Sequence, residues 1–298
     1  MKRRQMMLRT LAVSMFLFLS AGADAQGVII HKKYGAPIKV PFAELDSIST
    51  YDYEDETPIE NGHKYVDLGL PSGTLWATCN VGAEKPEDYG LYFAWGETVG
   101  YGPGTSDGKD GDTTDGREFN WTSYKWMDHS KNSQYGCLKY TFADGKTDGC
   151  WYSGNTYVGT TVDGKTYKTL TKLEAADDAA TANWGENWRM PTKAEQDELR
   201  NTSNCTWEKV MDGSTLKGYK VISKKAGYEG NSIFLPAAGY RSNSYLYYVG
   251  SRGYYWSSEL HTDYSISARS LYFLSSGVDW RFYDRHYGRS VRAVPQKK

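Results

Sequence analysis

The chain has 298 residues, a formal net charge of -1 at pH 7 and an apolar content of only 39%. This length allows one or two domains with a sizeable core. The balanced charge argues against a nucleic-acid partner, which normally needs a basic face. The 25 Tyr, 10 Trp and 31 Gly are typical of a β-rich protein with many tight turns.

The first 25 residues have the pattern of a secretory signal peptide. A basic start, KRR at residues 2–4, precedes an apolar run over residues 11–19, and ADA at residues 23–25 is a small-x-small cleavage pattern. The run is shorter than the ~20 residues that span a bilayer, and no later stretch is apolar enough to do so. We therefore expect a mature chain that starts near Gln26 and has no transmembrane segment. The exported protein would reside in the periplasm, on the cell surface or in the medium.

All four cysteines follow the predicted signal peptide, and an oxidising compartment favours disulfide formation. Four cysteines allow three connectivities, which sequence alone does not distinguish. We favour Cys137–Cys150 together with Cys79–Cys205. A zinc site is the rival interpretation, but the chain has no C-x-x-C pair and no His at ligand spacing.

Residues 26–54 predict a short β module in front of the main domain. Two candidate strands, at residues 27–31 and 38–42, flank a turn that contains Gly and Pro. Such a unit is too small to hold a core by itself. The acidic segment 55–60 is the predicted linker, and residues 61–295 are the predicted main domain.

The main domain predicts short strands between Gly-rich turns, with few helices. An Ala-rich helix is expected at residues 173–180, and Gly185 ends it or the turn that follows. Residues 100–164 are rich in Gly, Asp, Thr, Ser and Tyr, and they predict a long insertion of loops and short hairpins. The expected strands lie at residues 65–70, 75–81, 89–96, 206–210, 218–222, 232–235, 254–258, 268–273 and 290–294.

The clearest local signal lies at residues 188–199. Thr192 and Glu195 have the spacing of a capping box, in which each side chain bonds the backbone amide of the other residue. The proline before Thr192 forces an extended residue ahead of it, and Trp188 alternates with Arg189 in that extended stretch. We expect a strand that leads into a capped helix on the sheet, with these four residues in structural roles.

Six sequence blocks occur in a fixed order along the main domain. They are YVDLGLPSG (65–73), LWATCNVGA (75–83), WRMPT (188–192), LPAAGYR (235–241), GYYWSS (253–258) and GRSVR (288–292). In this order they resemble the family named for the Fibrobacter succinogenes major paralogous domain. The leading segment 27–51 is similar to a short module often found in front of such domains in exported bacterial proteins.

The resemblance implies a bacterial envelope or secreted protein. It also implies an irregular α+β fold related to C-type lectins and formylglycine-generating enzymes, with the two ends of the domain close together. The expected fold class is therefore α+β, C-type-lectin-like and β-rich, with one or two short helices and long loops.

The residues give little support to an enzyme. Formylglycine-generating enzymes hold copper with a closely spaced cysteine pair near the carboxy terminus, and this chain has no cysteine after Cys205. Its five His are scattered, without the spacing of an iron site. No nucleophile elbow occurs, whereas a Ser-His-Asp triad, whose members converge only in space, stays open. We expect a non-catalytic protein, with a divergent enzyme on the same scaffold as the alternative.

Four carboxylates, from Asp107, Asp110, Asp112 and Asp115, lie in one Gly-rich segment. Hard cations prefer such oxygen ligands, but Thr114 stands where an EF-hand needs a third carboxylate or amide. A structural calcium site and a solvated loop are the two interpretations, and we favour the loop. The Glu-Pro-Asn, Gln-Pro-Asp and Trp-Asn-Asp signatures of calcium-dependent C-type lectins are absent.

Aromatic side chains are the remaining binding candidates. Trp121, Trp126 and Tyr135 lie in the insertion, whereas Tyr247 and Tyr254 belong to a tyrosine-rich region. Flat rings stack on sugars or anchor protein contacts; the alternative is core packing and cross-strand pairing, with about half of the second group pointing inward. We predict that loops and aromatics bind a glycan or an envelope protein. A structural surface protein that docks through its amino-terminal module is a further alternative.

Arginine occurs in four places within the six blocks: Arg189, Arg241, Arg289 and Arg292. A forked guanidinium recognises anions, which makes anion binding one interpretation. We favour ion pairing within the fold, for which the candidate partners are Asp67, Asp177, Asp178 and Glu195. Trp256 and Arg292 are accordingly expected to be structural.

Overall fold

The computed structural model describes residues 27–30, 38–41, 57–103, 111–112, 116–127, 129, 137–140, 170–261 and 264–296, with four two-residue strands between residues 152 and 166. The chain divides into two compact units, Met1–Asp55 and Glu56–Lys298. In the first unit, β1 (Gly27–Ile30) pairs antiparallel with β2 (Ile38–Pro41). These are the two strands that the sequence predicts for the amino-terminal module.

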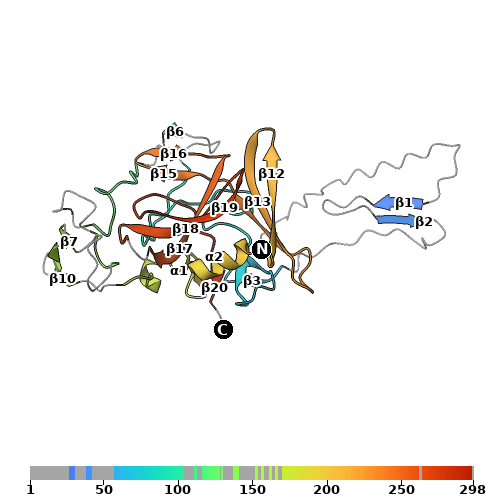
Figure 1. The fold of residues 1–298 in the computed structure, drawn as a ribbon, viewed down its shortest axis with the longest axis horizontal. Coiled ribbons are helices and arrows are strands. Elements are labelled where there is room, and N and C mark those ends of the chain that lie inside the picture. Colours follow the sequence, from blue (N-terminus) through green and yellow to red (C-terminus); the bar gives the residue numbers. More distant parts are fainter. Residues whose placement is uncertain are drawn as a thin grey trace, which may run out of the picture. The chain divides into compact units, whose positions relative to one another are not determined.

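The second unit is mostly β, as predicted, with two α-helices among its described residues (Figure 1). Two antiparallel sheets of three consecutive strands dominate it. The first contains β12 (Cys205–Asp212), β13 (Thr215–Ser223) and β14 (Ser232–Pro236). The second contains β17 (Arg252–Leu260), β18 (Ser267–Leu274) and β19 (Gly277–Asp284). Between them, β15 (Tyr240–Ser242) and β16 (Tyr245–Tyr247) form a hairpin that also pairs with β6 (Gly111–Asp112).

The beginning and the end of the second unit are hydrogen-bonded to each other. β3 (Ile59–Glu60), β4 (His63–Asp67) and β5 (Leu75–Ala77) form a small sheet, and the Ala77 amide donates to the Ala293 carbonyl at 3.0 Å. β11 (Trp188–Arg189) pairs with β20 (Val294–Pro295). The short hairpins are β7 (Tyr152–Ser153) with β8 (Thr156–Tyr157) and β9 (Thr161–Val162) with β10 (Lys165–Thr166).

Helix α1 (Ala179–Trp184) begins later than predicted because Asp178 caps it. A 3-10 turn at Ala175–Asp177 comes first. The Asp178 carboxylate then accepts from the amides of Ala180 and Thr181 at 2.9 and 3.0 Å and from the Met190 amide at 2.8 Å. Burial raises the pKa of Asp178 in spite of these hydrogen bonds. Gly185, at φ 93°, ends the helix as expected, in a conformation that favours glycine.

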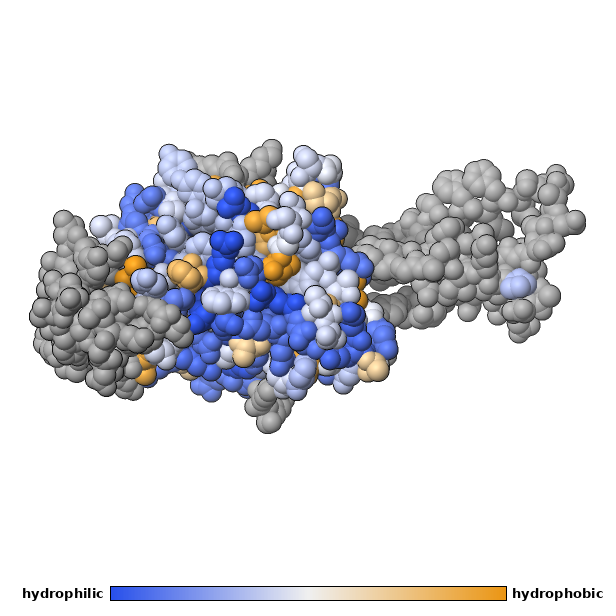
Figure 2. Space-filling model, in the orientation of Figure 1, coloured by the Kyte–Doolittle hydropathy of each residue, from blue (hydrophilic) through white to orange (hydrophobic). Residues whose placement is uncertain are grey.

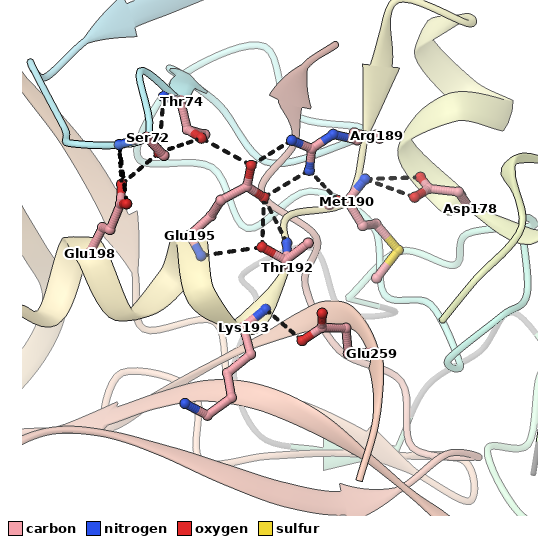
Figure 3. A network of polar contacts seen from close by, with 10 residues as sticks. All are labelled: Ser72, Thr74, Asp178, Arg189, Met190, Thr192, Lys193, Glu195, Glu198 and Glu259. Atoms are coloured by element: carbon pink, nitrogen blue, oxygen red, sulfur yellow. Dashed lines mark hydrogen bonds and ion pairs between the residues drawn. The ribbon is translucent and has the colours of Figure 1, made fainter. Parts of the chain in front are cut away.

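Helix α2 (Lys193–Arg200) carries the predicted capping box. Thr192 Oγ1 accepts from the Glu195 amide at 3.2 Å, and the Glu195 carboxylate accepts from the Thr192 amide at 2.8 Å. Arg189 donates to both carboxylate oxygens of Glu195, at 2.8 and 2.5 Å, and the Thr74 hydroxyl donates to one of them at 2.9 Å (Figure 3). Burial acts to raise the pKa of Glu195, but Arg189, Thr192 and Thr74 together lower it to about 2. The network therefore joins the start of the unit, β11 and α2.

Helix α2 covers one face of the sheet formed by β17, β18 and β19. Gln196 donates to the carbonyls of Tyr255 and Trp256 at 3.1 and 3.2 Å, while Leu199 is buried in one core cluster with Leu271. Because side chains alternate across a strand, the opposite face of this sheet carries a different set of residues, described below.

Several described residues of the insertion pack into the core. Tyr124 and Tyr140 are fully buried, and their hydroxyls donate to the Trp95 carbonyl at 2.6 Å and to Asp177 at 2.7 Å. The insertion contains short hairpins, as predicted, in β7–β8 and β9–β10. The prediction did not include this packing, because a segment poor in aliphatic residues can still build a core from rings. The buried members of this core cluster from the insertion are Phe119, Tyr124, Met127, Cys137 and Leu138.

Backbone carbonyl groups accept hydrogen bonds from three fully buried arginines. Each of the three donates to at least two backbone carbonyls. Short irregular strands leave such carbonyls without a ladder partner, and a guanidinium has five donors to offer. The three are Arg241, Arg285 and Arg292. The predicted ion pairing was right for Arg189, which pairs with Glu195. Arg292 donates instead to Asn80 and to backbone carbonyls, and to no described carboxylate.

The Cys79–Cys205 disulfide that we favoured is absent from the structure, where both residues are free thiols. Cys205 is buried at the start of β12, and burial raises the pKa of its thiol to about 11. The sulfur of Cys79 lies 3.5 Å from the hydroxyl of Thr78. Cys137 is buried in the core, and Cys150 lies outside the described residues.

Candidate functional site

A cluster of tyrosines covers the face of the β17–β18–β19 sheet that α2 leaves open. The cross-strand register places Tyr255 and Leu271 on the α2 side, so Tyr254 and Tyr272, one position along, face the other way. The β15–β16 hairpin and the segment after β19 add further rings. We define the tyrosine cluster as Tyr240, Tyr245, Tyr247, Tyr248, Tyr254, Tyr272, Tyr283 and Tyr287.

The rings of the tyrosine cluster are in continuous contact. The ring centroid of Tyr240 lies 5.5 Å from that of Tyr247 and 5.1 Å from that of Tyr254. Tyr254 in turn lies 5.1 Å from Tyr272 and 5.5 Å from Tyr283. These are the separations of favourable aromatic pairs, so the cluster is a packed platform and not a set of independent side chains.

The outer members of the cluster are exposed, and the inner ones are not. Tyr245, Tyr247 and Tyr248 are 46%, 36% and 39% exposed, whereas Tyr254 is 2% exposed. Burial raises the pKa of Tyr254 to about 12, so its ring stays neutral. Within the part of the chain that the structure describes, seven of the eight members make no side-chain hydrogen bond, and the exception is Tyr254. The platform therefore offers both flat rings and uncommitted hydroxyls.

The backbone around the β15–β16 hairpin fixes the outer rings. Tyr248 has a φ of 60°, which is rare for an aromatic residue, and its carbonyl accepts from the Arg252 amide at 3.0 Å. The Arg252 guanidinium lies 3.8 Å from the Tyr248 ring centroid. Gly239, at φ 64°, packs so closely that a Cβ there would lie 2.1 Å from the Tyr247 carbonyl oxygen. The hairpin is thus held against the sheet by contacts that admit few substitutions.

Arg289 is fully buried beneath the cluster. Its guanidinium carbon lies 3.6 Å from the ring centroid of Tyr283 and 4.6 Å from those of Tyr254 and Trp256. Its side chain donates to Ser270 Oγ at 3.4 Å, and its Nε has no partner among the described residues. Burial lowers the pKa of Arg289 to about 10, against the effect of the tyrosines. The predicted carboxylate pairing was wrong here because cation–π contacts take its place.

The structure brings three of the five predicted binding residues to this region. Tyr247 is an exposed member of the cluster, and Tyr254 is a buried one. Trp121 reaches the cluster indirectly, because its ring lies 4.5 Å from that of His286, which lies 4.3 Å from Tyr287.

The other two predicted binding residues are not in the cluster. Trp126 donates from Nε1 to the Gly96 carbonyl at 2.7 Å, and its ring meets that of Tyr140 at 6.0 Å. It is half-buried beside the core. Tyr135 lies outside the described residues.

The calcium prediction falls largely outside the described residues, which exclude Asp107, Asp110 and Asp115; Asp112 is in β6. Within the described ranges, no group of three or more His, Cys, Asp or Glu residues could hold a metal ion. The calcium site stays a prediction.

The same ranges contain no helix with the length and apolar character that a membrane crossing requires.

The surface drawn in Figure 2 is mostly hydrophilic or neutral, with hydrophobic residues in small, separate spots. A broad apolar patch would instead point to a large protein contact. On this side of the molecule, amphipathic rings and polar groups are therefore the available means of recognition.

The sequence interpretation missed Tyr240, Tyr283, Tyr287 and Arg252 as site residues. A usable signal was present, because residues 278–283 alternate between two faces after Gly277 and so predict a strand. That strand, β19, would have placed Tyr283 on the sheet. Tyr240 and Tyr287 gave no local signal, because their positions depend on how loops return to the sheet.

Fold and site together define a mostly β domain with a tyrosine-lined face. Comparison with known proteins gave no match for this chain, whether with family models, with curated protein sequences or with solved structures.

Proposed function

We propose that this chain is an exported bacterial envelope protein that binds a glycan on the tyrosine cluster, without catalysis. The observation that carries the proposal is the exposure of Tyr245, Tyr247 and Tyr248 side by side on a fixed hairpin. A sugar ring has a flat C–H face and a rim of hydroxyls. It can therefore stack on a tyrosine ring and exchange hydrogen bonds with the phenolic hydroxyl.

A glycan fits the cluster better than an apolar protein surface does. The exposed large hydrophobic residues of the cluster are all tyrosines. Tyrosine supplies contact area and hydrogen bonding at a low cost in rotamer entropy. The exposed aliphatic side chains of the described residues lie on other segments; they are Ile59, Val99, Val210 and Met211.

We further propose that the second unit is a C-type-lectin-like domain of the Fibrobacter succinogenes major paralogous type. Contacts between the sequence blocks support this: Arg292, from the last block, donates to the carbonyls of Ala77 and Thr78 in the second block at 3.0 and 2.9 Å. The joined ends of the unit also agree with such a domain. Export rests on the signal-peptide pattern at residues 1–25, which lies outside the described residues.

A glycan array probed with the purified chain tests the proposed function. The informative variant is Tyr247→Ala with Tyr248→Ala, because both rings are exposed and their removal leaves the buried rings in place. Tyr264→Ala is the matched control, since Tyr264 is 51% exposed and lies outside the cluster. We expect the double variant to lose binding and the control to keep it. The proposal is wrong if the wild-type chain binds no glycan on the array, or if the double variant binds as well as the wild-type chain.

A further inference from the structure

Three arginines surround the tyrosine cluster without a carboxylate partner among the described residues. Arg252 lies over Tyr248 and donates to the Tyr254 hydroxyl at 3.5 Å. The guanidinium carbon of Arg281, an exposed residue of β19, lies 5.0 Å from the ring centroid of Tyr272. Arg289 is buried below both, among rings.

Several arginines elsewhere in the second unit pair with carboxylates, whereas these three pair with none that the structure describes. Arg117 pairs with Glu97 at 2.8 Å, and Arg200 pairs with Asp197 at 2.9 Å and with Asp279 at 3.0 Å. Asp279 of β19 lies opposite Tyr272 in the register, and its carboxylate is paired with Arg200.

Asp284, next to Tyr283 in the chain, interacts electrostatically with Arg289 and Tyr287. Its carboxylate is half-buried and accepts from the Ser267 hydroxyl at 3.4 Å. Burial raises the pKa of Asp284, against the effects of Ser267 and Arg289. Arg252 and Arg281 therefore supply positive charge without a carboxylate partner among the described residues, beside the aromatic surface of the cluster.

We infer that the ligand of the tyrosine cluster is an acidic oligosaccharide, whose carboxylate or sulfate groups are bound by Arg252 and Arg281 while its sugar rings stack on Tyr247 and Tyr248. This inference rests on the proposed function and names the class of glycan. A guanidinium fork matches the oxygen pairs of carboxylate and sulfate. Arg289 is shut off from solvent, so it contributes through its field and not through contact.

The arrangement of the two accessible arginines defines the ligand further. Arg252 is on β17 and Arg281 is on β19, with β18 between them. Arg252 lies opposite Leu274 and Arg281 lies opposite Ser270, so two strand spacings and a four-residue offset along β18 separate their backbones by roughly 16 Å. One acidic group cannot bridge both forks easily, so the ligand carries acidic groups on more than one sugar.

The test uses the full chain and pairs of oligosaccharides that differ only in charge. Oligouronates are compared with their carboxyl-reduced forms, and sulfated oligosaccharides with their desulfated forms. The variant is Arg252→Gln with Arg281→Gln. Its matched control is Lys209→Gln with Lys217→Gln, which removes two positive charges from the exposed β12–β13 hairpin.

We expect an acidic oligosaccharide to bind at least tenfold more tightly than its neutral form, and the arginine variant to lower its affinity to that of the neutral form. The control should retain the preference, and added salt should weaken acidic binding alone. Binding of the neutral form by the arginine variant also shows that the variant is folded.

Two results would overturn the inference in distinguishable ways. If acidic and neutral forms bind alike and the Tyr247/Tyr248 variant still abolishes binding, the inference is wrong and the proposed function stands. If poly-glutamate binds as tightly as the acidic oligosaccharides, the ligand class is wrong. Binding of no oligosaccharide at all would remove the proposed function as well.

Discussion

Replacement of Glu195 by glutamine is expected to destabilise the second unit far more than the same change at a neighbouring surface position. Glu195 accepts hydrogen bonds from Arg189, Thr192 and Thr74 (Figure 3). Removal of one partner from a buried ion pair costs roughly 3–5 kcal/mol. Because the side chains of Arg189 and Glu195 keep 18% and 9% exposure, we expect a value near the lower end, about 3 kcal/mol.

The pKa of Glu195 sets the pH range of this effect. Its folded-state pKa of about 2 lies below the ordinary value of 4.5. The carboxylate therefore stabilises the fold fully above pH 4.5, and this contribution is lost as the pH falls toward 2. The difference in stability between the wild-type chain and Glu195→Gln should shrink over that range.

Thermal unfolding measured by circular dichroism provides the assay. For a domain of this size, about 3 kcal/mol corresponds to a fall in Tm of about 6–12 °C. Asp197→Asn is the control, because Asp197 is on the same helix and pairs with Lys193 and Arg200 at the surface. Exposed pairs contribute roughly 0.2–1 kcal/mol. An equal loss of Tm in both variants at pH 7, or a Glu195→Gln deficit that persists unchanged at pH 2.5, would refute the reasoning.

Three further predictions concern His286, Trp126 and the cysteines. Burial, with Arg289 and Arg117, lowers the pKa of His286 to about 3. The free energy of unfolding should therefore decline from pH 6.5 toward pH 3, by at most about 1.4 kcal/mol per pH unit. Thermal melts of His286→Phe should show a shallower decline, and pH profiles identical to those of the wild-type chain would contradict this. Trp126→Ala should lower the free energy of unfolding by about 2–3 kcal/mol in urea titrations and leave glycan binding intact. Loss of glycan binding with no change in the free energy of unfolding would instead support the binding role that the sequence predicts for Trp126. Mass spectrometry after alkylation without reductant should find Cys79 and Cys205 as thiols; a disulfide between them would contradict the structure.

Local signals predicted the parts of the fold in which neighbours along the chain interact. The Thr192–Glu195 capping box, the burial of Trp188 and the ending of α1 at Gly185 depend on residues within one or two turns of each other. Asp178 shows the limit of this reasoning. Its carboxylate caps α1, but it also binds the amide of Met190 on the neighbouring strand, a contact that sequence spacing does not reveal.

Longer-range features were predicted less well. Strand β19 was missed, and residues 290–294, expected as a strand, contribute only the start of β20 and a bridge at Ser290. The interior arginines were assigned carboxylate partners because charge complementarity is the only partner rule that a sequence offers. In the fold, carbonyls of irregular strands and tyrosine rings satisfy Arg292 and Arg289 instead.

The candidate site was predicted only in part, for the same reason. Tyr247 was expected at a binding face, and it is exposed in the tyrosine cluster. Tyr240 and Tyr287 joined the cluster only when β15 and the segment after β19 packed together. Trp121 and Trp126 were favoured because they lack a strand context, yet rings outside strands pack in this core as well.

A nitration footprint tests most directly whether the tyrosine cluster is a glycan-binding face. The chain is treated with tetranitromethane, with and without the tightest glycan from the array, and the modified tyrosines are identified by peptide mass spectrometry. We expect bound glycan to protect Tyr245, Tyr247 and Tyr248 and to leave Tyr264, which is exposed elsewhere, as reactive as before. Equal nitration of the three cluster tyrosines with and without saturating glycan would contradict this expectation.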